Sequence, residues 1–226
     1  MIDFIVARAT LMYLMLGSTV LSFLWLLFAC RKKLNAKWWD LLIASISATI
    51  VGVLATVLFG MIESGFKVTD ATSLFGSIFI VPLFCLVYAK IRKLPYKVVL
   101  DSFTIVLVIS AMTARINCII SGCCYGNFIG DSYIRHPVRE VEIGYDVLFI
   151  GVTAWFYITN KFEGKLYIFY LVSYGFIRFI LESLRYSPTR GFFHIGHAWS
   201  LVAFLFGIGY LIISYYLKRD KEKNSN

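Results

Sequence analysis

The chain has 226 residues, of which 59% are hydrophobic and only 15% are charged, and its mean hydropathy is +0.77. Soluble domains of this length are less apolar, so the composition excludes an ordinary soluble globular protein and predicts an integral membrane protein. The formal net charge of +9 does not indicate nucleic-acid binding, because the sequence contains no soluble module that would bind nucleic acid.

Seven windows are apolar enough, and at about 20 residues long enough, to cross a hydrocarbon core of roughly 30 Å. They cover residues 9–29, 38–61, 71–89, 98–120, 144–160, 165–182 and 195–217. The sequence therefore predicts an all-α integral membrane protein of about seven helices, with residues 1–226 forming a single transmembrane domain and residues 218–226 a basic tail. The first window lacks a small-residue cleavage site and is interpreted as a spanning helix, not as a signal peptide.

The connections between these windows differ in charge. Alternate connections and the tail hold fourteen cations, namely Arg31, Lys32, Lys33, Lys37, Lys90, Arg92, Lys93, Lys97, Lys161, Lys165, Lys218, Arg219, Lys221 and Lys223. The other connections and the amino terminus hold six, namely Arg8, Lys67, Arg135, Arg139, Arg185 and Arg190. Positive charges of short loops stay preferentially in the cytoplasm, which predicts an external amino terminus and a cytoplasmic carboxyl terminus.

The two remaining cations, Arg115 and Arg178, lie inside apolar windows. A cation at the bilayer centre costs about 2.5–3.5 kcal/mol or more, so each arginine marks a candidate functional site with an anionic partner. Each lies near the outer end of a helix that leads into a long outer loop. The two arginines are therefore expected in one layer of the membrane, where a phospholipid head group is a candidate partner.

Helical spacing places Tyr174, Arg178 and Glu182 on one face of the sixth window, and Arg185 follows at an i+3 step. One interpretation is an internal Arg178–Glu182 ion pair with Tyr174 as a packing aromatic. The other keeps part of the Arg178 guanidinium free for phosphate, since its planar fork can donate to a carboxylate on one edge and to phosphate on another.

The segment 115–126, RINCIISGCCYG, ends a helix in a turn bounded by Gly122 and Gly126, which can adopt positive φ or allow close backbone approach. The five cysteines of the chain match no zinc-binding spacing, so no metal site is predicted and no cofactor is expected. The spacing leaves open a disulfide between Cys118 and either cysteine of the following pair, but favours small packing residues.

Three blocks, in order, resemble the prolipoprotein diacylglyceryl transferases of bacterial plasma membranes. Residues 115–126 resemble a signature block of that family in the form that ends Gly-Cys-Cys-Tyr-Gly. Residues 135–142 resemble a second block, with Arg139 where glutamine is usual, and residues 174–185 match a third, Tyr-Gly-x-x-Arg-Phe-x-x-Glu-x-x-Arg. Residues 195–200 are similar to the family's entry into its last helix.

The resemblance implies transfer of the diacylglyceryl unit of phosphatidylglycerol to the lipobox cysteine thiol of prolipoproteins, the first step of bacterial lipoprotein maturation. It implies a multi-pass protein of the bacterial plasma membrane with its site toward the outer leaflet. Its partners would be phosphatidylglycerol, prolipoprotein signal peptides and membrane lipid, with no nucleic acid. The implied catalytic residues are Arg115, Arg178, Tyr174 and His136, and the implied substrate-binding residues are Arg115, Gly122, Tyr125, Gly126, Glu142, Glu182 and Arg185.

Two departures from the family pattern affect these roles. The usual histidine-glycine-glycine before the third helix is not visible, so His136 is expected to be the general base, with Tyr174 or His197 as alternatives. The signature block has Cys118 and Ser121 where asparagines are usual.

Residues of the second block are expected in the outer loop. There Glu140 and Glu142 would hold Arg135 or Arg139 in exposed pairs that contribute little to stability, and a solvated loop position is favoured for Arg139. Two other functions remain open: a related phospholipid-dependent transferase with another acceptor, and a non-catalytic lipid-binding or transport protein. A transporter typically shows internal repeats or broken helices, and neither is apparent in the sequence.

Overall fold

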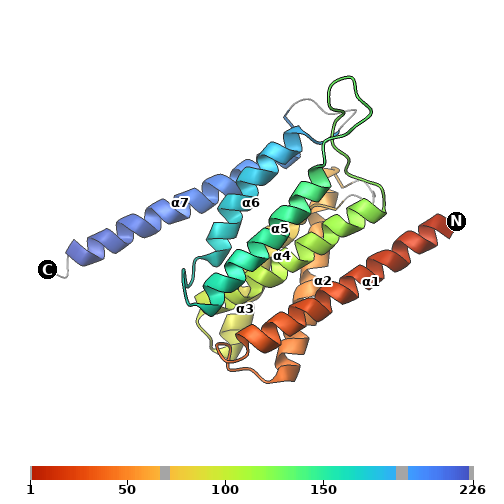
Figure 1. The fold of residues 1–226 in the computed structure, drawn as a ribbon. Helices are drawn as coiled ribbons and strands as arrows, with labels where there is room; N and C mark the ends of the chain where they lie inside the picture. The colour runs from red at the N-terminus through yellow and green to blue at the C-terminus, as the bar shows by residue number, and fades with distance from the viewer. Residues whose placement is uncertain (1, 67–71, 187–192, 224–226) are drawn as a thin grey trace.

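A computed structural model describes residues 2–66, 72–186 and 193–223 (Figure 1). Within these ranges the chain is helical, and its extended pairing is limited to two isolated β-bridges. The helices are α1 (Ile2–Trp25) with its π-helical continuation η1 (Leu26–Cys30), α2 (Trp38–Glu63), α3 (Leu74–Arg92), α4 (Tyr96–Ile120), α5 (Val138–Ile158), α6 (Leu166–Ser183) and α7 (Ile195–Lys223).

The all-α membrane fold predicted from the sequence is confirmed. Seven helices of the described residues are long and apolar enough to cross a membrane. These runs form helices because a helix satisfies every backbone N–H and C=O within its own segment, where no water is available to do so. The predicted basic tail continues α7 as far as Lys223, and residues 224–226 lie outside the described residues.

Most spans agree closely with the predicted windows, but the fifth begins at Val138 and not at residue 144. The hydropathy signal is weak there because Glu140 and Glu142 belong to the first turns of α5. Pro137 occupies the N-cap position, and the fixed φ of proline suits the start of a helix. The expectation that these two glutamates lie in a loop is therefore wrong.

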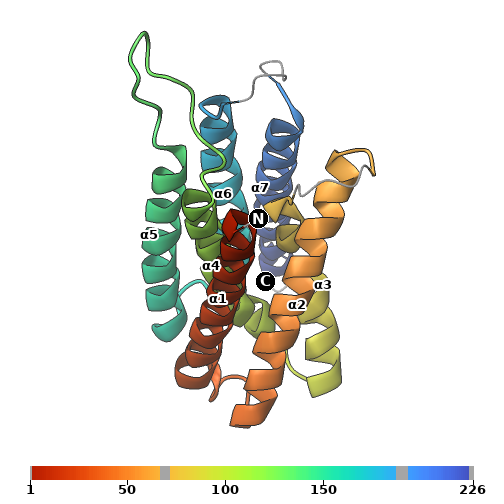
Figure 2. The same cartoon turned by 90° about the vertical axis from the view of Figure 1, so that its right-hand side faces the viewer.

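Successive helices run in opposite directions, so their connections gather at two ends of the bundle (Figure 2). One end, the basic end, holds the α1–α2, α3–α4 and α5–α6 connections, and ten of the fourteen cations predicted to be cytoplasmic lie in or beside them. The other end holds the 121–137 loop and the last turns of α4 and α6, and is called the site end below. Two of the cations predicted on the outer side, Lys67 and Arg190, lie outside the described residues.

Helix α4 is the central helix of the bundle, packed against α1, α3, α5 and α6. Residues 99–109 of α4 are buried without a break, as expected for a helix with neighbours on every side. The spans Thr10–Cys30 and Ile195–Leu217, of α1 with η1 and of α7, have few buried residues and would face lipid. Helix α7 packs closely on α6 at Gly175, where an added Cβ would lie 2.8 Å from the Ser200 carbonyl oxygen. A small residue at a helix contact allows the two backbones to approach.

Candidate active site

Ion pairs between charged side chains join α4, α5 and α6 at the site end. Arg115 Nε on α4 lies 2.8 Å from Glu142 Oε2 on α5, and the other oxygen of Glu142 contacts Arg178 Nη1 on α6. Arg178 Nη2 in turn lies 2.5 Å from Glu182 Oε2, one turn further along α6. The side chains of these four residues are only 3–10% exposed. One carboxylate, that of Glu142, therefore ties together the two arginines that the sequence placed inside the membrane.

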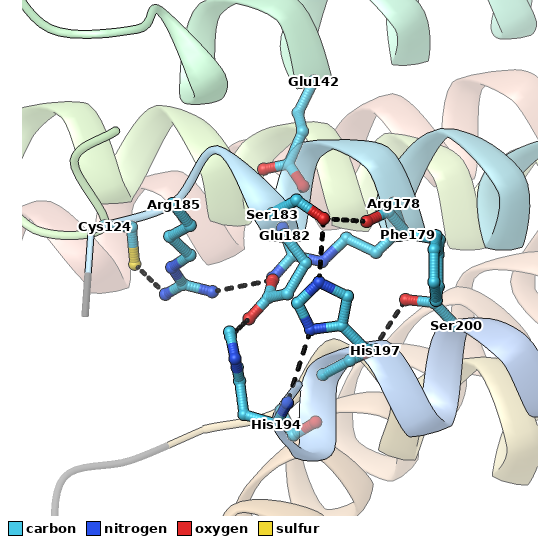
Figure 3. A network of polar contacts seen from close by, with 12 residues as sticks. Cys124, Glu142, Arg178, Phe179, Glu182, Ser183, Arg185, His194, His197 and Ser200 are labelled. Atoms are coloured by element: carbon cyan, nitrogen blue, oxygen red, sulfur yellow. Dashed lines mark hydrogen bonds and ion pairs between the residues drawn. The ribbon is translucent and has the colours of Figure 1, made fainter. Parts of the chain in front are cut away.

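The same chain of contacts continues toward the 121–126 turn (Figure 3). Arg185 Nη1 lies 3.6 Å from Glu182 Oε2, and Arg185 Nη2 donates to Cys124 Sγ at 2.7 Å. His194 Nε2 lies 3.0 Å from the other oxygen of Glu182. Glu182 is thus held between Arg178, Arg185 and His194, and the charged network reaches from Arg115 to Cys124. We call Arg115, Glu142, Arg178, Glu182 and Arg185 the arginine–glutamate chain.

The stripe predicted on α6 is confirmed, because Tyr174, Arg178 and Glu182 are all buried on one face of the helix. The internal Arg178–Glu182 pair is present, and Arg178 also binds Glu142. The expectation that Arg115 and Arg178 share one layer is confirmed as well, since one carboxylate contacts both. Tyr174 adds a polar contact, because its hydroxyl accepts a hydrogen bond from Arg115 Nη2 at 3.4 Å.

Arg115 and Arg178 each have a nitrogen without a protein partner in the described part of the structure. Arg178 Nε is buried and forms no hydrogen bond, and Arg115 Nη1 takes part in no ion pair or hydrogen bond. The ion-paired set of three arginines and two glutamates also carries one positive charge in excess. Unpaired donors and an excess cation in a water-poor layer favour the binding of an anion.

A third carboxyl group, missed by reasoning from the sequence, lies near this layer. Asp146 follows Glu142 by one turn on α5, is 2% exposed, and its Oδ1 forms no hydrogen bond. The sequence does carry a signal for Asp146, namely its i+4 spacing from Glu142, because residues four apart share a helix face. The site therefore has a carboxyl group that is not engaged in an ion pair.

The predicted general base, His136, lies at the end of the 121–137 loop, beside Gly126. Its backbone N–H donates to the Asn127 carbonyl at 2.9 Å, within a short hairpin marked by the Phe128–Arg135 β-bridge. Among the described residues its ring forms no hydrogen bond or ion pair. The backbone of His136 thus belongs to this hairpin, and His136 is not a member of the arginine–glutamate chain.

The alternative base His197 is buried at the start of α7 and held as a hydrogen-bond donor. Its Nδ1 accepts from the His194 backbone N–H at 3.5 Å, so the ring proton is on Nε2. Nε2 lies 3.0 Å from Ser183 Oγ, and that hydroxyl itself donates to the Phe179 carbonyl. In this arrangement His197 has no basic nitrogen directed at the site.

The glycines of the 121–126 turn adopt the conformations expected of them. Gly122 has φ +60°, and the backbone of Gly126 pairs with that of Arg185. A Cβ at Gly126 would collide with the carbonyl oxygen of His136, so only glycine fits there. This pairing positions Arg185 beside the turn, whereas Tyr125, predicted at the head-group site, is 41% exposed.

Arg139 lies in the first turn of α5 and binds the 121–126 turn, so the expectation of a solvated loop position is wrong. Its Nη1 donates to the carbonyl oxygens of Cys118, at 3.3 Å, and Cys123, at 3.1 Å. Its guanidinium carbon lies 4.4 Å from the centre of the Tyr125 ring, a cation–π contact. Arg139 therefore clamps the end of α4 to the turn that follows it, and pairs with Glu140 only at 3.5 Å.

The turn also brings three thiols together, which the spacing of the cysteines did not predict. All five cysteines are free, and the Sγ atoms of Cys118, Cys123 and Cys124 lie within 4.8 Å of one another. Hydrogen bonds from the other two thiols, together with Arg185, hold the pKa of the Cys124 thiol below its ordinary value. Hydrogen bonds with the Cys118 and Cys124 thiols raise the pKa of the Cys123 thiol.

Comparison with protein families assigns the chain to a family. The family model described as prolipoprotein diacylglyceryl transferase matches residues 8–213, nearly the whole chain. The chain belongs to the prolipoprotein diacylglyceryl transferase family. It is thus a member of a family of membrane transferases that act in lipoprotein biosynthesis. In a comparison with curated proteins, none shows significant similarity to the chain.

The three blocks that resemble prolipoprotein diacylglyceryl transferases converge on one carboxylate in this structure. The first block supplies Arg115, the second supplies Glu142, and the third supplies Arg178 and Glu182. Residues that are far apart in the sequence are therefore joined within the transferase by direct ion pairs. This convergence gives the blocks a common physical role, the placing of cations in the membrane.

Proposed function

We propose that this protein transfers the diacylglyceryl unit of phosphatidylglycerol to the lipobox cysteine thiol of prolipoproteins. The observation that carries the proposal is the Glu142 carboxylate, which holds the Arg115 and Arg178 guanidinium groups in one buried layer. The family supports the class of reaction, and the geometry supports a phosphate-bearing donor.

The reaction requires stabilisation of a leaving phosphate. The acceptor thiolate attacks the glyceryl carbon, the carbon–oxygen bond breaks, and its electron pair stays on the phosphate oxygen. Glycerol phosphate then leaves with one more negative charge than the phosphodiester had. Fixed cations in a site of low dielectric constant stabilise that charge as it develops. Arg115 Nη1 and Arg178 Nε are the donors proposed for this contact.

The remaining residues of the site are proposed to position these two arginines. Tyr174 contacts Arg115, and Glu182 holds Arg178 and Arg185 on one side of the layer. Gly126, through its backbone pairing with Arg185, sets the position of that third arginine, and Gly122 and Tyr125 complete the turn beside it. Among the described residues the His136 ring forms no hydrogen bond or ion pair, so its proposed role as base rests on the resemblance alone.

The proposed location is the bacterial plasma membrane, with the site end toward the outer leaflet. The concentration of lysines and arginines at the opposite end of the bundle supports this orientation. A site in that layer would meet the phosphatidylglycerol head group and the membrane-spanning signal peptide of an acceptor in the same place.

Mass spectrometry of a synthetic lipobox peptide, incubated with purified protein and phosphatidylglycerol, tests the proposal. We expect a diacylglyceryl adduct on the peptide cysteine that is lost in Arg115→Ala and Arg178→Ala. Arg92→Ala is the matched control, because Arg92 forms its 3.0 Å pair with Asp40 at the basic end. Consumption of lipid without a peptide adduct would indicate another acceptor, and intact lipid with a well-folded protein would indicate a binding function.

A further inference from the structure

The thiols of Cys118, Cys123 and Cys124, called the thiol trio below, have no role in the function proposed so far. Cys118 is near the end of α4, and the other two follow in the turn. Their three Sγ atoms lie within 4.8 Å of one another. Cys30 and Cys85 are buried in the helical core, so the remaining cysteines of the chain are not part of the trio.

The local backbone is arranged to bring these sulfurs together. Cys124 has φ +61°, a left-handed conformation that a residue with a side chain rarely adopts. Such conformations are strained and persist where the surroundings impose them, often at functional sites. Here Arg139 binds the carbonyl oxygens of Cys118 and Cys123, and Arg185 donates to Cys124 Sγ. Arg139 thus holds the backbone of Cys118 and Cys123, and Arg185 holds the side chain of Cys124.

The trio suits a soft or borderline metal ion. Zinc binds thiolate at about 2.3 Å, which places the sulfurs of a tetrahedral site about 3.8 Å apart, so the trio needs a contraction of at most about 1 Å. Three thiolates around Zn²⁺ leave one negative charge, and Arg185 lies 2.7 Å from Cys124 Sγ to balance it. The thiols are partly accessible, with Cys123 exposed, so an ion can enter.

We propose that the thiol trio binds Zn²⁺ and that the fourth position of this zinc takes the cysteine thiol of the acceptor peptide. Catalytic zinc sites typically have three protein ligands and one open position, whereas structural sites have four. The second part of the inference rests on the transferase function proposed above. It supplies the deprotonation of the acceptor thiol, because zinc deprotonates a thiol that coordinates it.

The position of the trio fits this role. Arg185 contacts both Cys124 Sγ and Glu182, and Glu182 contacts Arg178 (Figure 3). A thiolate held on the trio would therefore lie on the same side of the bundle as the arginines proposed to hold the phosphate. Nucleophile and leaving group would be positioned by one connected set of side chains.

The step balances as follows. The peptide thiol releases its proton to solvent when its sulfur coordinates zinc. The sulfur then forms a bond to the glyceryl carbon of phosphatidylglycerol, and the bond from that carbon to the phosphate oxygen breaks with its electron pair on oxygen. The product thioether is neutral and a weaker ligand than the thiolate, so it leaves the zinc.

Cobalt(II) titration of the reduced, metal-free protein in detergent tests the metal site without any turnover. We expect thiolate-to-cobalt charge-transfer absorption at one Co²⁺ per chain, lost in Cys123→Ser and in Cys118→Ser, and retained in the core control Cys85→Ala. Zinc analysis of protein purified without chelator should give one zinc per chain. A protein that lacks this absorption, or in which Cys123→Ser leaves it unchanged, overturns the site, as does a disulfide within the trio in protein purified without reductant.

The open position is tested by adding a lipobox peptide to the cobalt-loaded protein with no phosphatidylglycerol present. We expect the peptide with cysteine to intensify the charge-transfer absorption and its serine counterpart to leave the spectrum unchanged. An identical spectrum with both peptides would make the metal structural and overturn the acceptor role.

Activity separates this inference from the proposed function. An unbound thiol of pKa about 8.5 is only about 3% thiolate at pH 7, so chelation of zinc should slow transfer roughly thirtyfold at that pH, with recovery on adding Zn²⁺. The deficit should shrink as the pH rises toward 8.5. Full transfer by chelated protein would overturn the zinc role and leave the proposed function standing. A cobalt site dependent on Cys123, in a protein that transfers nothing, would support the metal site and refute the proposed function.

Discussion

Glu142 on α5 and Arg115 on α4 form a buried ion pair of 2.8 Å between Oε2 and Nε, and the second oxygen of the same carboxylate contacts Arg178 on α6. Two guanidinium groups so close together would repel each other in a medium of low dielectric constant. The shared carboxylate offsets that repulsion and still leaves an N–H group of each arginine without a partner. The pair therefore makes possible a concentrated positive site inside the membrane.

Glu142→Gln removes this shared charge while keeping the shape of the side chain. Breaking a buried ion pair by removing one partner typically costs about 3–5 kcal/mol, because the remaining charges are left uncompensated. We expect a lower thermal midpoint in detergent, followed by tryptophan fluorescence, and a loss of diacylglyceryl transfer. Glu140→Gln is the control on the same helix, since Glu140 is exposed and pairs with Arg139 only at 3.5 Å. Equal stability of the two variants would refute the bridging role of Glu142.

The helices and the α6 stripe could be predicted because both are local properties of the sequence. Apolar runs define the spans, and i+4 spacing alone places Arg178 and Glu182 in contact. The layer shared by Arg115 and Arg178 followed from topology. These features require no knowledge of how one helix is rotated against another.

The contacts of Glu142 could not be predicted, because they depend on how α5 faces α4 and α6. Helix α5 begins directly after Pro137, earlier than predicted. Glu142 is therefore a buried residue of the helix and not a residue of the expected loop. The place of His136 likewise depends on the loop, which the Phe128–Arg135 bridge folds into a short hairpin, and its role as base stays a prediction. The thiol trio depends on the left-handed turn at Cys124, for which a cysteine gives no sequence signal.

Arg178→Lys tests whether the shape of the guanidinium matters as well as its charge. Arg178 binds one carboxylate through each terminal nitrogen, an arrangement that the single ammonium group of lysine does not reproduce. We expect transfer to slow by about a hundredfold, the size of effect seen when one preorganised donor to a developing anion is removed. Rates of the purified variants with the lipobox peptide measure this. Arg92→Lys, in the pair with Asp40 at the basic end, should keep full activity, and an equal loss in both variants would argue against a specific role.

Asp101→Asn should destabilise the basic end without affecting the site directly. Asp101 is a buried residue of α4 whose carboxylate accepts from the backbone N–H of Gly164 and, at 3.1 Å, from that of Leu166. It therefore holds the α5–α6 connection against the central helix. An amide keeps one acceptor oxygen, and leaving a buried donor unpaired costs about 1–3 kcal/mol. The thermal midpoint should fall, while the transfer rate of the folded fraction, measured well below that midpoint, should match the parent chain.

Labelling of introduced cysteines tests the predicted orientation. Tyr133 is 99% exposed in the loop at the site end, and Lys161 is exposed in the α5–α6 connection at the basic end. In a background carrying Cys118→Ser, Cys123→Ser and Cys124→Ser, a membrane-impermeant maleimide applied to intact cells should label Tyr133→Cys and not Lys161→Cys. Both variants should react after the membrane is opened. If Lys161→Cys alone were labelled in intact cells, the orientation would be the reverse of the predicted one, and the site would lie on the cytoplasmic side.

Gly175→Ala should separate α7 from α6, because the added Cβ would lie 2.8 Å from both the Ser200 carbonyl oxygen and the Phe204 backbone nitrogen. Overpacking of this kind typically costs about 1–3 kcal/mol, and here backbone atoms, which cannot rotate away, are the obstacle. Gly209→Ala on α7 is the matched control, since no atom lies within 4 Å of its added Cβ. Its replacement should leave the thermal midpoint unchanged or raise it slightly, because alanine favours a helix by up to about 1 kcal/mol over glycine. The difference between the two midpoints measures the close contact itself, and two equal midpoints would show that α6 and α7 do not pack at this distance.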